Sequence, residues 1–281
     1  MLTSLPVDAG IGLKPEFFAE LDAYRQQGLW FEIHAENYLI DGGPRLEALS
    51  EIAHHIPLSI HGVGASLGSP EPVCQKHLQR IRKLCERVPC AAFSEHIAWS
   101  SVGGEYYSNL MPVPRTKDSV KYTAENIMRV QDALGRSILV ENPANYIELA
   151  SEFGEADYLM ELVHQTQCGL LLDVNNLFIS GKNINIDIAE YIRSLDSDAI
   201  GEIHIAGHTT DPNEAGLLID SHDQPVADSV WELLSSVLEQ TGPKPVLIER
   251  DSNLPPLAEL MAERDFASDV IRQKQTVKAL S

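Results

Sequence analysis

Short apolar runs alternate with amphipathic stretches along the chain, and most of the runs end in polar residues. Near-continuous apolar runs are typical of parallel strands that are buried on both faces. Eight such strands in alternation with eight helices predict an α/β fold, and we expect a single (β/α)8 TIM barrel over residues 1–281. The expected strands span residues 9–13, 30–36, 58–61, 91–96, 138–141, 169–173, 200–205 and 246–249.

Amphipathic segments between these strands predict the helices. A G-x-G-x-x-G motif does not follow the first strand, which disfavours an open dinucleotide-binding sheet. Two connections are long, at residues 99–114 and 207–227, and we expect a small hairpin within the first. Long strand-to-helix loops lie on the catalytic face of a barrel. The expected helices span residues 16–27, 44–54, 72–87, 115–134, 155–165, 186–195, 228–240 and 256–273, the last leading into a tail at 281.

Composition narrows the function classes. The chain has 21 basic and 41 acidic residues, a formal net charge of −20, which would repel nucleic acid. It contains no apolar stretch of about 18 residues and no secretory signal pattern, so we expect a cytoplasmic protein without a membrane contact. The spacing of the four cysteines matches no zinc motif, and we expect them to be small, buried and reduced: Cys74, Cys85, Cys90 and Cys168.

Metal-binding residue types stand at six consecutive strand ends. In a parallel barrel these ends converge on one mouth, so the side chains should meet there. Carboxylates that meet without compensation raise each other's pKa, and cations remove that cost. One histidine at a strand end is more often structural than a ligand, so the prediction depends on the whole set. Imidazole and carboxylate ligands suit zinc, iron or manganese. The set is His61, His96, Glu141, Asp173, His204 and Glu249.

The long loop after the seventh strand adds a further pair, Asp220 and His222. Together with Asn176 this pair is a candidate for one more ion. His34 and Glu202 are expected two residues below the mouth, as hydrogen-bonding residues behind the ligands. Other polar residues near the strand ends are candidates for contacts with the ligands or the substrate: Glu36, Asn37, Asn142, Asn145, Asn175, His208, Asp223 and Arg250.

Several motifs between residues 10 and 251 resemble one bacterial family. They are GIGLK, FEIHAENY, SIHG, SEHIAWS, ENPANY, LLDVNN, EIHIAGH and DSHDQPV. The family is UPF0276, whose members are described as multinuclear non-haem iron-dependent oxidative enzymes related to the methanobactin biosynthesis oxidase. The resemblance implies a xylose isomerase-like barrel, similar also to the endonuclease IV class.

Carried over to this chain, the resemblance implies three metal sites. His61, His96 and Glu141 would hold one ion, and Glu141 would bridge to a second that Asp173, His204 and Glu249 complete. Asn176, Asp220 and His222 would hold a third, and the endonuclease relatives have histidine at the position of Asn176. Glu141, Asp173 and His204 are the implied catalytic residues.

The implied reaction is the oxidation of cysteine, or of another residue, in a small ribosomally made peptide. It would use two or three iron ions and dioxygen, with zinc or manganese able to occupy the isolated protein, and a small partner protein could deliver the peptide. Three alternatives stay open from the residues: a divalent-metal sugar isomerase or epimerase, a zinc-dependent endonuclease-like phosphoesterase, and a metal-binding module without turnover.

Overall fold

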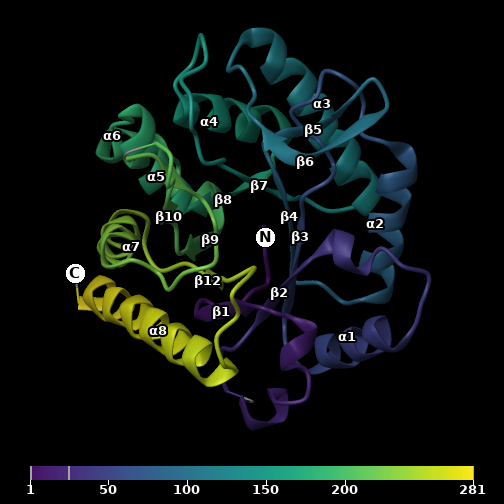
Figure 1. Cartoon of the computed structure of the whole chain (residues 1–281), viewed down its shortest axis with the longest axis vertical. Helices are drawn as coiled ribbons and strands as arrows, with labels where there is room; N and C mark the ends of the chain where they lie inside the picture. The colour runs from purple at the N-terminus through teal and green to yellow at the C-terminus, as the bar shows by residue number, and fades with distance from the viewer. Residues whose placement is uncertain (1, 25, 215, 281) are drawn as a thin grey trace.

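The computed structural model describes residues 2–24, 26–214 and 216–280, and its main strands close into a barrel. All neighbouring strands are parallel, in the order β1-β12-β9-β8-β7-β4-β3-β2, with β2 paired to β1. The predicted TIM barrel is confirmed, and Figure 1 shows helices surrounding the strands. The strands are β1 (Ala9–Gly12), β2 (Phe31–His34), β3 (Leu58–Gly62), β4 (Ala92–His96), β7 (Leu139–Glu141), β8 (Gly169–Asp173), β9 (Ile200–Ala206) and β12 (Val246–Glu249).

The helices pack their apolar faces on the barrel. In α3, for example, Thr116 caps the first turn by accepting a hydrogen bond from the Ser119 backbone, and Ile127 and Val130 are fully buried. The α-helices of the described residues are α1 (Pro44–His55), α2 (Gln75–Arg87), α3 (Lys117–Leu134), α4 (Glu155–Thr166), α5 (Val174–Ile184), α6 (Ile188–Ser194), α7 (Asp228–Thr241) and α8 (Leu257–Leu280).

The prediction of a helix at 16–27 is wrong. Two short 3-10 helices stand there, η1 (Pro15–Phe17) and η2 (Leu21–Tyr24), while Arg25 lies outside the described residues. Backbone N–H groups in this stretch donate to the carbonyl three residues earlier, which winds the chain more tightly than an α-helix. This winding buries Phe17 and Leu21 in a connection that must turn at Gly28, where φ is +81°, before β2 begins.

Helix α5 was not expected, because the motif LLLDVNN reads as a strand followed by a loop. Asp173 ends β8 and also caps α5, since its side chain accepts a hydrogen bond of 2.6 Å from the Asn176 backbone. Asn175 and Asn176 therefore lie in the first helical turn, directly above a strand end. An aspartate immediately before a run with buried Leu177 and Ile179 was the signal for this helix.

Strand β2 is shorter than expected and ends at His34. A 3-10 helix, η3 (Ala35–Tyr38), follows it, so Glu36 and Asn37 lie beyond the strand. His34 is therefore at the mouth of the barrel and not below it, which corrects the expected depth.

The hairpin expected within 99–114 is confirmed. It consists of β5 (Trp99–Val102) and β6 (Glu105–Met111), which pair antiparallel across Gly103 and Gly104, both with positive φ. A smaller antiparallel pair, β10 (Thr209–Thr210) and β11 (Leu218–Ile219), lies in the other long connection. Both hairpins follow the carboxyl ends of barrel strands, so they stand over the mouth.

The four cysteines are free, but only Cys168 is buried. Cys85 and Cys90 are half-buried and Cys74 is exposed, so the expectation that all four are buried is wrong. Cys74 stands at the N-cap position of α2, before the first buried residue of that helix, Leu78.

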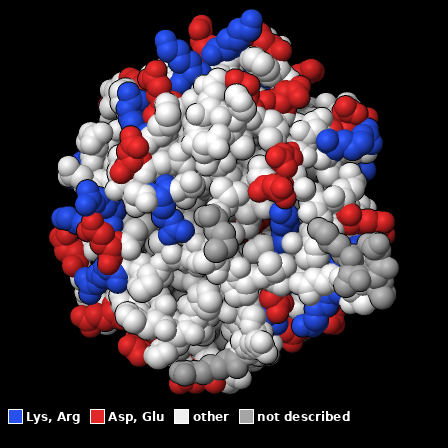
Figure 2. All heavy atoms as spheres, turned by 180° about the vertical axis from the view of Figure 1, so that it is seen from behind, with Lys and Arg blue, Asp and Glu red and all other residues white. Residues whose placement is uncertain are grey.

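Charged side chains of both signs lie mainly around the margin of the face drawn in Figure 2. Acidic and basic side chains are interspersed around its margin, and mainly uncharged residues fill its middle. Across the residues that the structure describes, no helix is both long and apolar enough to span a bilayer.

Candidate metal centre

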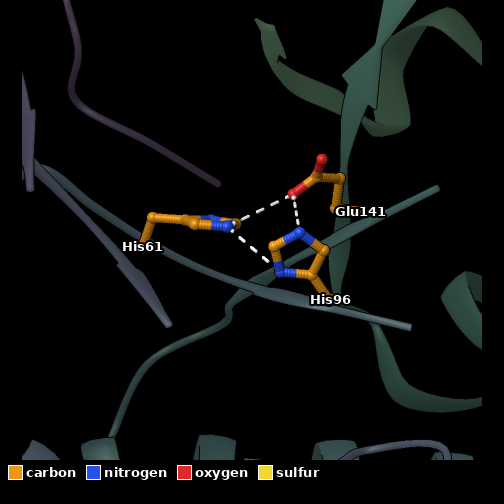
Figure 3. A group of neighbouring side chains, drawn as sticks. All are labelled: His61, His96 and Glu141. Carbon is orange, nitrogen blue, oxygen red and sulfur yellow. Dashed lines mark hydrogen bonds and ion pairs between the residues drawn. The ribbon is translucent and has the colours of Figure 1, made fainter. Parts of the chain in front are cut away.

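Three side chains from neighbouring strands meet at the mouth of the barrel (Figure 3). His61 comes from β3, His96 from β4 and Glu141 from β7. The Oε2 atom of Glu141 lies 3.4 Å from Nε2 of His61 and 3.3 Å from Nε2 of His96. Ligand atoms of a tetrahedral site are roughly 3.3–3.4 Å apart when their bonds to the metal measure about 2.0–2.1 Å. These distances suit one cation bound by all three side chains.

Burial determines the charge of this group. It lowers the pKa of His61 well below its usual value, with His96 and His204 adding to the effect, and it lowers the pKa of His96 to about 4. Both imidazoles are therefore neutral at pH 7, the state in which a ring nitrogen can bind a metal. Burial also raises the pKa of Glu141 well above its usual value, and the nearby Asp173 and Glu249 contribute.

Glu141 also belongs to a second group, with Asp173 and His204, whose ligand atoms lie within 4.8 Å of one another. The Nδ1 atom of His204 in turn lies 3.2 Å from Oε2 of Glu249. Asp173 is fixed by its backbone, because its N–H donates to Asn142 Oδ1 and its carbonyl accepts from Asn142 Nδ2. Glu141 thus stands between the two groups, where a bridging carboxylate would stand.

The second group contains more carboxylates than the first. Burial raises the pKa of Asp173 to about 7, and Asp220 adds to this. Burial alone would lower the pKa of His204, but Glu32, Glu202 and Glu249 outweigh it and raise that pKa well above its usual value. For Glu249 the opposite holds: burial favours its neutral form, yet His222, His204 and His34 lower its pKa well below the usual value.

The loop residues Asp220 and His222 join the centre from the side of β12. The Nε2 atom of His222 lies 2.7 Å from Oδ1 of Asp220, and its Nδ1 atom lies 3.5 Å from Oε2 of Glu249. His222 has a left-handed backbone, with φ of +48°, and its N–H donates to Gly207. Asp173, His222 and Glu249 form another group within 4.8 Å, so Glu249 is shared in the same way as Glu141.

The two asparagines at the start of α5 face different groups. Asn176 Nδ2 donates to the Asn142 carbonyl at 3.1 Å and lies 3.3 Å from Glu141 Oε1, while its Oδ1 atom has no hydrogen-bond partner. Asn175 Nδ2 donates to Asp220 Oδ1 at 2.8 Å, and Asn175 Oδ1 pairs with His208 Nδ1 at 2.8 Å. The structure thus brings Asn175 and His208 to the loop pair, and Asn176 to Glu141.

The remaining flanking candidates are divided between the centre and the periphery. Asn142 braces Asp173, and Glu36 forms an ion pair of 3.2 Å with His77 of α2. Asn37 is exposed. Three others are engaged elsewhere: Asn145 with Ser180 and Glu155, Asp223 with Ser221, and Arg250 with Glu263.

Two side chains that were not in the predicted ligand set also reach the centre. His34 Nε2 lies 3.4 Å from Glu249 Oε1 and 3.6 Å from Asp251 Oδ1. Asp251 Oδ2 also lies 3.2 Å from His222 Nδ1, and its other oxygen pairs with Lys14 at 2.6 Å. The signal for Asp251 was present, because it follows Glu249 at the end of the eighth barrel strand.

Unpaired polar atoms concentrate here. Several buried side-chain atoms of the centre have no hydrogen-bond partner, and each such atom costs about 1–3 kcal/mol when it stays unpaired. Divalent cations would pair them, and the mixture of imidazole nitrogen and carboxylate oxygen suits iron, zinc or manganese. The donor set therefore fits resident metal ions. The atoms without a hydrogen bond, some of which do have an ion-pair neighbour, are Glu141 Oε2, Asp173 Oδ2, Asn176 Oδ1, both ring nitrogens of His204, and His222 Nε2.

Comparison with known proteins identifies the family. The sequence model of the RiPP precursor modification enzymes MbnB/TglH/ChrH matches residues 8–272. The chain belongs to this family. RiPPs are ribosomally made, post-translationally modified peptides, so its members act on precursor peptides.

The relatives extend over nearly the whole chain. A UPF0276 protein of Caulobacter vibrioides is 44% identical over 271 residues, covering 96% of this chain and 97% of the relative. A UPF0276 protein of Chromobacterium violaceum is 42% identical over 272 residues, covering 96% of this chain and 97% of the relative. The predicted membership of UPF0276 is therefore confirmed.

Similar solved structures support the fold of this chain and nothing more. A D-psicose 3-epimerase from Clostridium cellulolyticum has a TM-score of 0.61 at 15% identity, covering 95% of this chain and 99% of the epimerase. Endonuclease IV from Thermus thermophilus has a TM-score of 0.60 at 14% identity, covering 96% of this chain and 99% of the endonuclease. Both belong with the xylose isomerase-like barrels, as expected.

Proposed function

We propose that the chain is a multinuclear iron-dependent oxidase that modifies a cysteine of a small ribosomally made peptide with dioxygen. The observation that carries the proposal is the set of overlapping ligand groups at the mouth, which share Glu141 and Glu249 and leave buried atoms unpaired. Shared carboxylates favour several adjacent ions over one. Bound iron would supply redox chemistry with dioxygen and a Lewis acid for the substrate thiol.

The ligand assignment follows the groups. His61, His96 and Glu141 would hold one ion, and Glu141 with Asp173, His204 and Glu249 would hold the second. The third, at Asp220 and His222, would use Asn176 as an oxygen ligand, whose Oδ1 atom is unpaired. Asn142 would keep Asp173 in place through its two backbone hydrogen bonds.

A groove of about 500 Å³, lined in part by the segments that follow β2 and β3, supports a peptide substrate. Its lining includes Gly64, in the loop that follows His61, together with Glu36 and Tyr106. Tyr106 stands on the β5–β6 hairpin beside other exposed large side chains, Tyr107 and Leu110. Exposed aromatic residues next to polar groups are typical of surfaces that bind peptides, so we assign this groove to the chain on one side of the modified cysteine.

The test uses the protein purified without oxygen and reconstituted with iron(II). It is incubated with a candidate precursor peptide that contains cysteine, and dioxygen is then admitted. We expect oxygen consumption and a change in peptide mass that a serine version of the peptide does not undergo. The Glu141→Ala variant should be inactive, because it removes a ligand from two ions. Full activity and full metal content in that variant would refute the bridging role.

A parallel incubation under nitrogen separates this function from sugar chemistry. A ketohexose is supplied with manganese and its products are examined. Epimerisation without oxygen, with no change in the peptide mass under air, would overturn the proposal in favour of the sugar epimerase alternative.

A further inference from the structure

The interior of the barrel directly below the metal centre holds a polar layer. Glu32 of β2, Ser59 of β3, and Glu202 and His204 of β9 have exposed fractions of 2%, 0%, 0% and 0%. The interior layers of a TIM barrel are ordinarily filled by branched apolar side chains. Two buried carboxylates at this position cost stability, so their presence calls for a physical reason.

The layer crosses the barrel from one side to the other. Glu32 and Ser59 are partners in the register of β2 and β3, and Ser59 Oγ lies 2.9 Å from Glu32 Oε2. The same hydroxyl oxygen lies 3.2 Å from Glu202 Oε2 of β9, which is four places from β3 in the order of the barrel. In a barrel of eight strands this is the opposite wall, so Ser59 connects the two carboxylates across the axis.

His204 connects the two carboxylates of this layer to the metal centre. Its Nε2 atom is 3.3 Å from Glu32 Oε1 and 3.5 Å from Glu202 Oε1. Its Nδ1 atom, on the other side of the ring, is 3.2 Å from Glu249 Oε2. An imidazole with carboxylates behind one nitrogen presents the other nitrogen in a fixed direction, as carboxylate–histidine–metal arrangements do.

We propose that Glu32 and Glu202 are positioning residues, which hold His204 with its Nδ1 atom toward the ion that it shares with Glu249. Ser59 keeps the two carboxylates at a fixed separation across the barrel. The inference rests on the proposed function in one respect, namely that His204 binds a metal. It adds a role for a pair of carboxylates that do not themselves face the mouth.

The test measures cobalt(II) binding to the whole metal-free chain, without peptide and without oxygen. Cobalt absorbs visible light according to the geometry of its ligands, so its spectrum reports on the direction of His204. The variants are Glu32→Gln and Glu202→Gln, each close in volume to the carboxylate that it replaces. We expect each to weaken cobalt binding at one site by roughly 10–100-fold and to alter the visible spectrum.

Glu155→Gln is the matched control. Glu155 is also a buried carboxylate, but it pairs with Arg115 and Tyr191 near α4. We expect this variant to lower the melting temperature while cobalt affinity and spectrum stay as in the wild type. Its behaviour separates the general effect of losing a buried carboxylate from the specific effect on His204.

Two results would overturn the inference. One is wild-type cobalt affinity and spectrum in both glutamine variants. The other is the loss of one whole equivalent of cobalt with an unchanged spectrum for the rest, which would mean that Glu32, Glu202 and His204 themselves hold an ion. Failure of the proposed oxidase function is seen separately, because it would leave the peptide unmodified while the cobalt results stand.

Discussion

The two ends of the barrel differ in how many of their buried polar atoms lack a hydrogen bond. At the mouth, Glu141 and Asp173 keep carboxylate oxygens without hydrogen-bond partners. At the base, Arg264 of α8 donates from Nε to the Ala9 carbonyl at 2.9 Å, and its Nη2 atom, which forms no hydrogen bond, lies 3.3 Å from the Asp8 carboxylate. Asp8 also accepts from Ser268, and its carbonyl accepts from Trp30 Nε1. More of the unpaired buried atoms thus lie at the mouth than around Arg264, as expected if the base serves stability and the mouth serves function.

The largest effect should come from Glu141→Gln, which tests this division at the mouth. Peptide oxidation should be lost, because glutamine cannot bridge two ions as a carboxylate does. The metal-free variant should nevertheless melt higher than the metal-free wild type, since burial and the neighbouring carboxylates raise the pKa of Glu141 and so disfavour its charge. A rise of roughly 2–4 °C corresponds to about 1 kcal/mol in a chain of this size.

Calorimetry of the two metal-free proteins measures this effect. The wild type loaded with zinc supplies the reference for a filled centre, and it should melt above both. A lower melting temperature for the metal-free variant would mean that the Glu141 carboxylate stabilises the metal-free protein. The proposed contrast between the mouth and the base would then be wrong.

Arg264→Ala should have the opposite signature at the base. It removes the partner of the Ala9 carbonyl and leaves Asp8 with less positive charge nearby. Arg264 is buried and Asp8 is 20% exposed, so the loss should cost about 2–3 kcal/mol, somewhat less than breaking a fully buried pair, or roughly 4–12 °C in melting temperature. The metal content per folded molecule should not change, since no described residue of α8 belongs to the ligand groups of the centre.

Metal analysis of the folded fraction, below the melting temperature of the variant, checks this point. Arg272→Ala is the control, because Arg272 lies on the same helix, is exposed and pairs only with Asp269 in the described contacts. It should be almost neutral. Loss of metal from Arg264→Ala would show that the base and the mouth are coupled.

Gly10→Ala tests the packing of the base on a smaller scale. A Cβ atom at Gly10 would lie 2.4 Å from the ring of Trp30, which is fully buried. The ring must move, and such overpacking costs about 1–3 kcal/mol. Gly12 lies in the same strand, and its Cβ would meet no atom closer than 3.9 Å, so Gly12→Ala is the matched control. Equal melting temperatures for the two variants would contradict the close packing of the base.

These positions also show how far the sequence could predict the molecule. The barrel and the residues at the strand ends were predictable, because apolar runs mark parallel strands and their ends must converge. Helix α5 was missed because Asp173 serves both as a strand end and as a helix cap. Glu32 was missed for another reason: a charged residue inside an apolar strand gives no sign of its neighbour, and its partner Glu202 comes from the other side of the barrel.

The smallest effect concerns a thiol near the base. Cys90 precedes β4, and Arg136 Nη1 lies 3.2 Å from its sulfur. The hydrogen bond from Cys85 lowers the pKa of Cys90 to about 7 against the effect of burial, and Arg136 assists. Only the thiolate is alkylated, so the rate of reaction with iodoacetamide should rise as pH increases through about 7 and level off above it. Mass spectrometry of digests can follow Cys90 separately from Cys85, because Arg87 lies between them.

Arg136→Gln should move this midpoint to higher pH and slow the labelling of Cys90 at neutral pH, since a favourable charge beside the thiolate is lost. A cavity of about 350 Å³ lined by Cys85, Cys90 and Arg136 gives the reagent access. The same variant should bind cobalt as the wild type does, because this cavity adjoins the start of β4 and the ligands stand at the other end of that strand. An unchanged midpoint would refute the role of Arg136, and altered cobalt binding would show that the two ends of the barrel do not act independently.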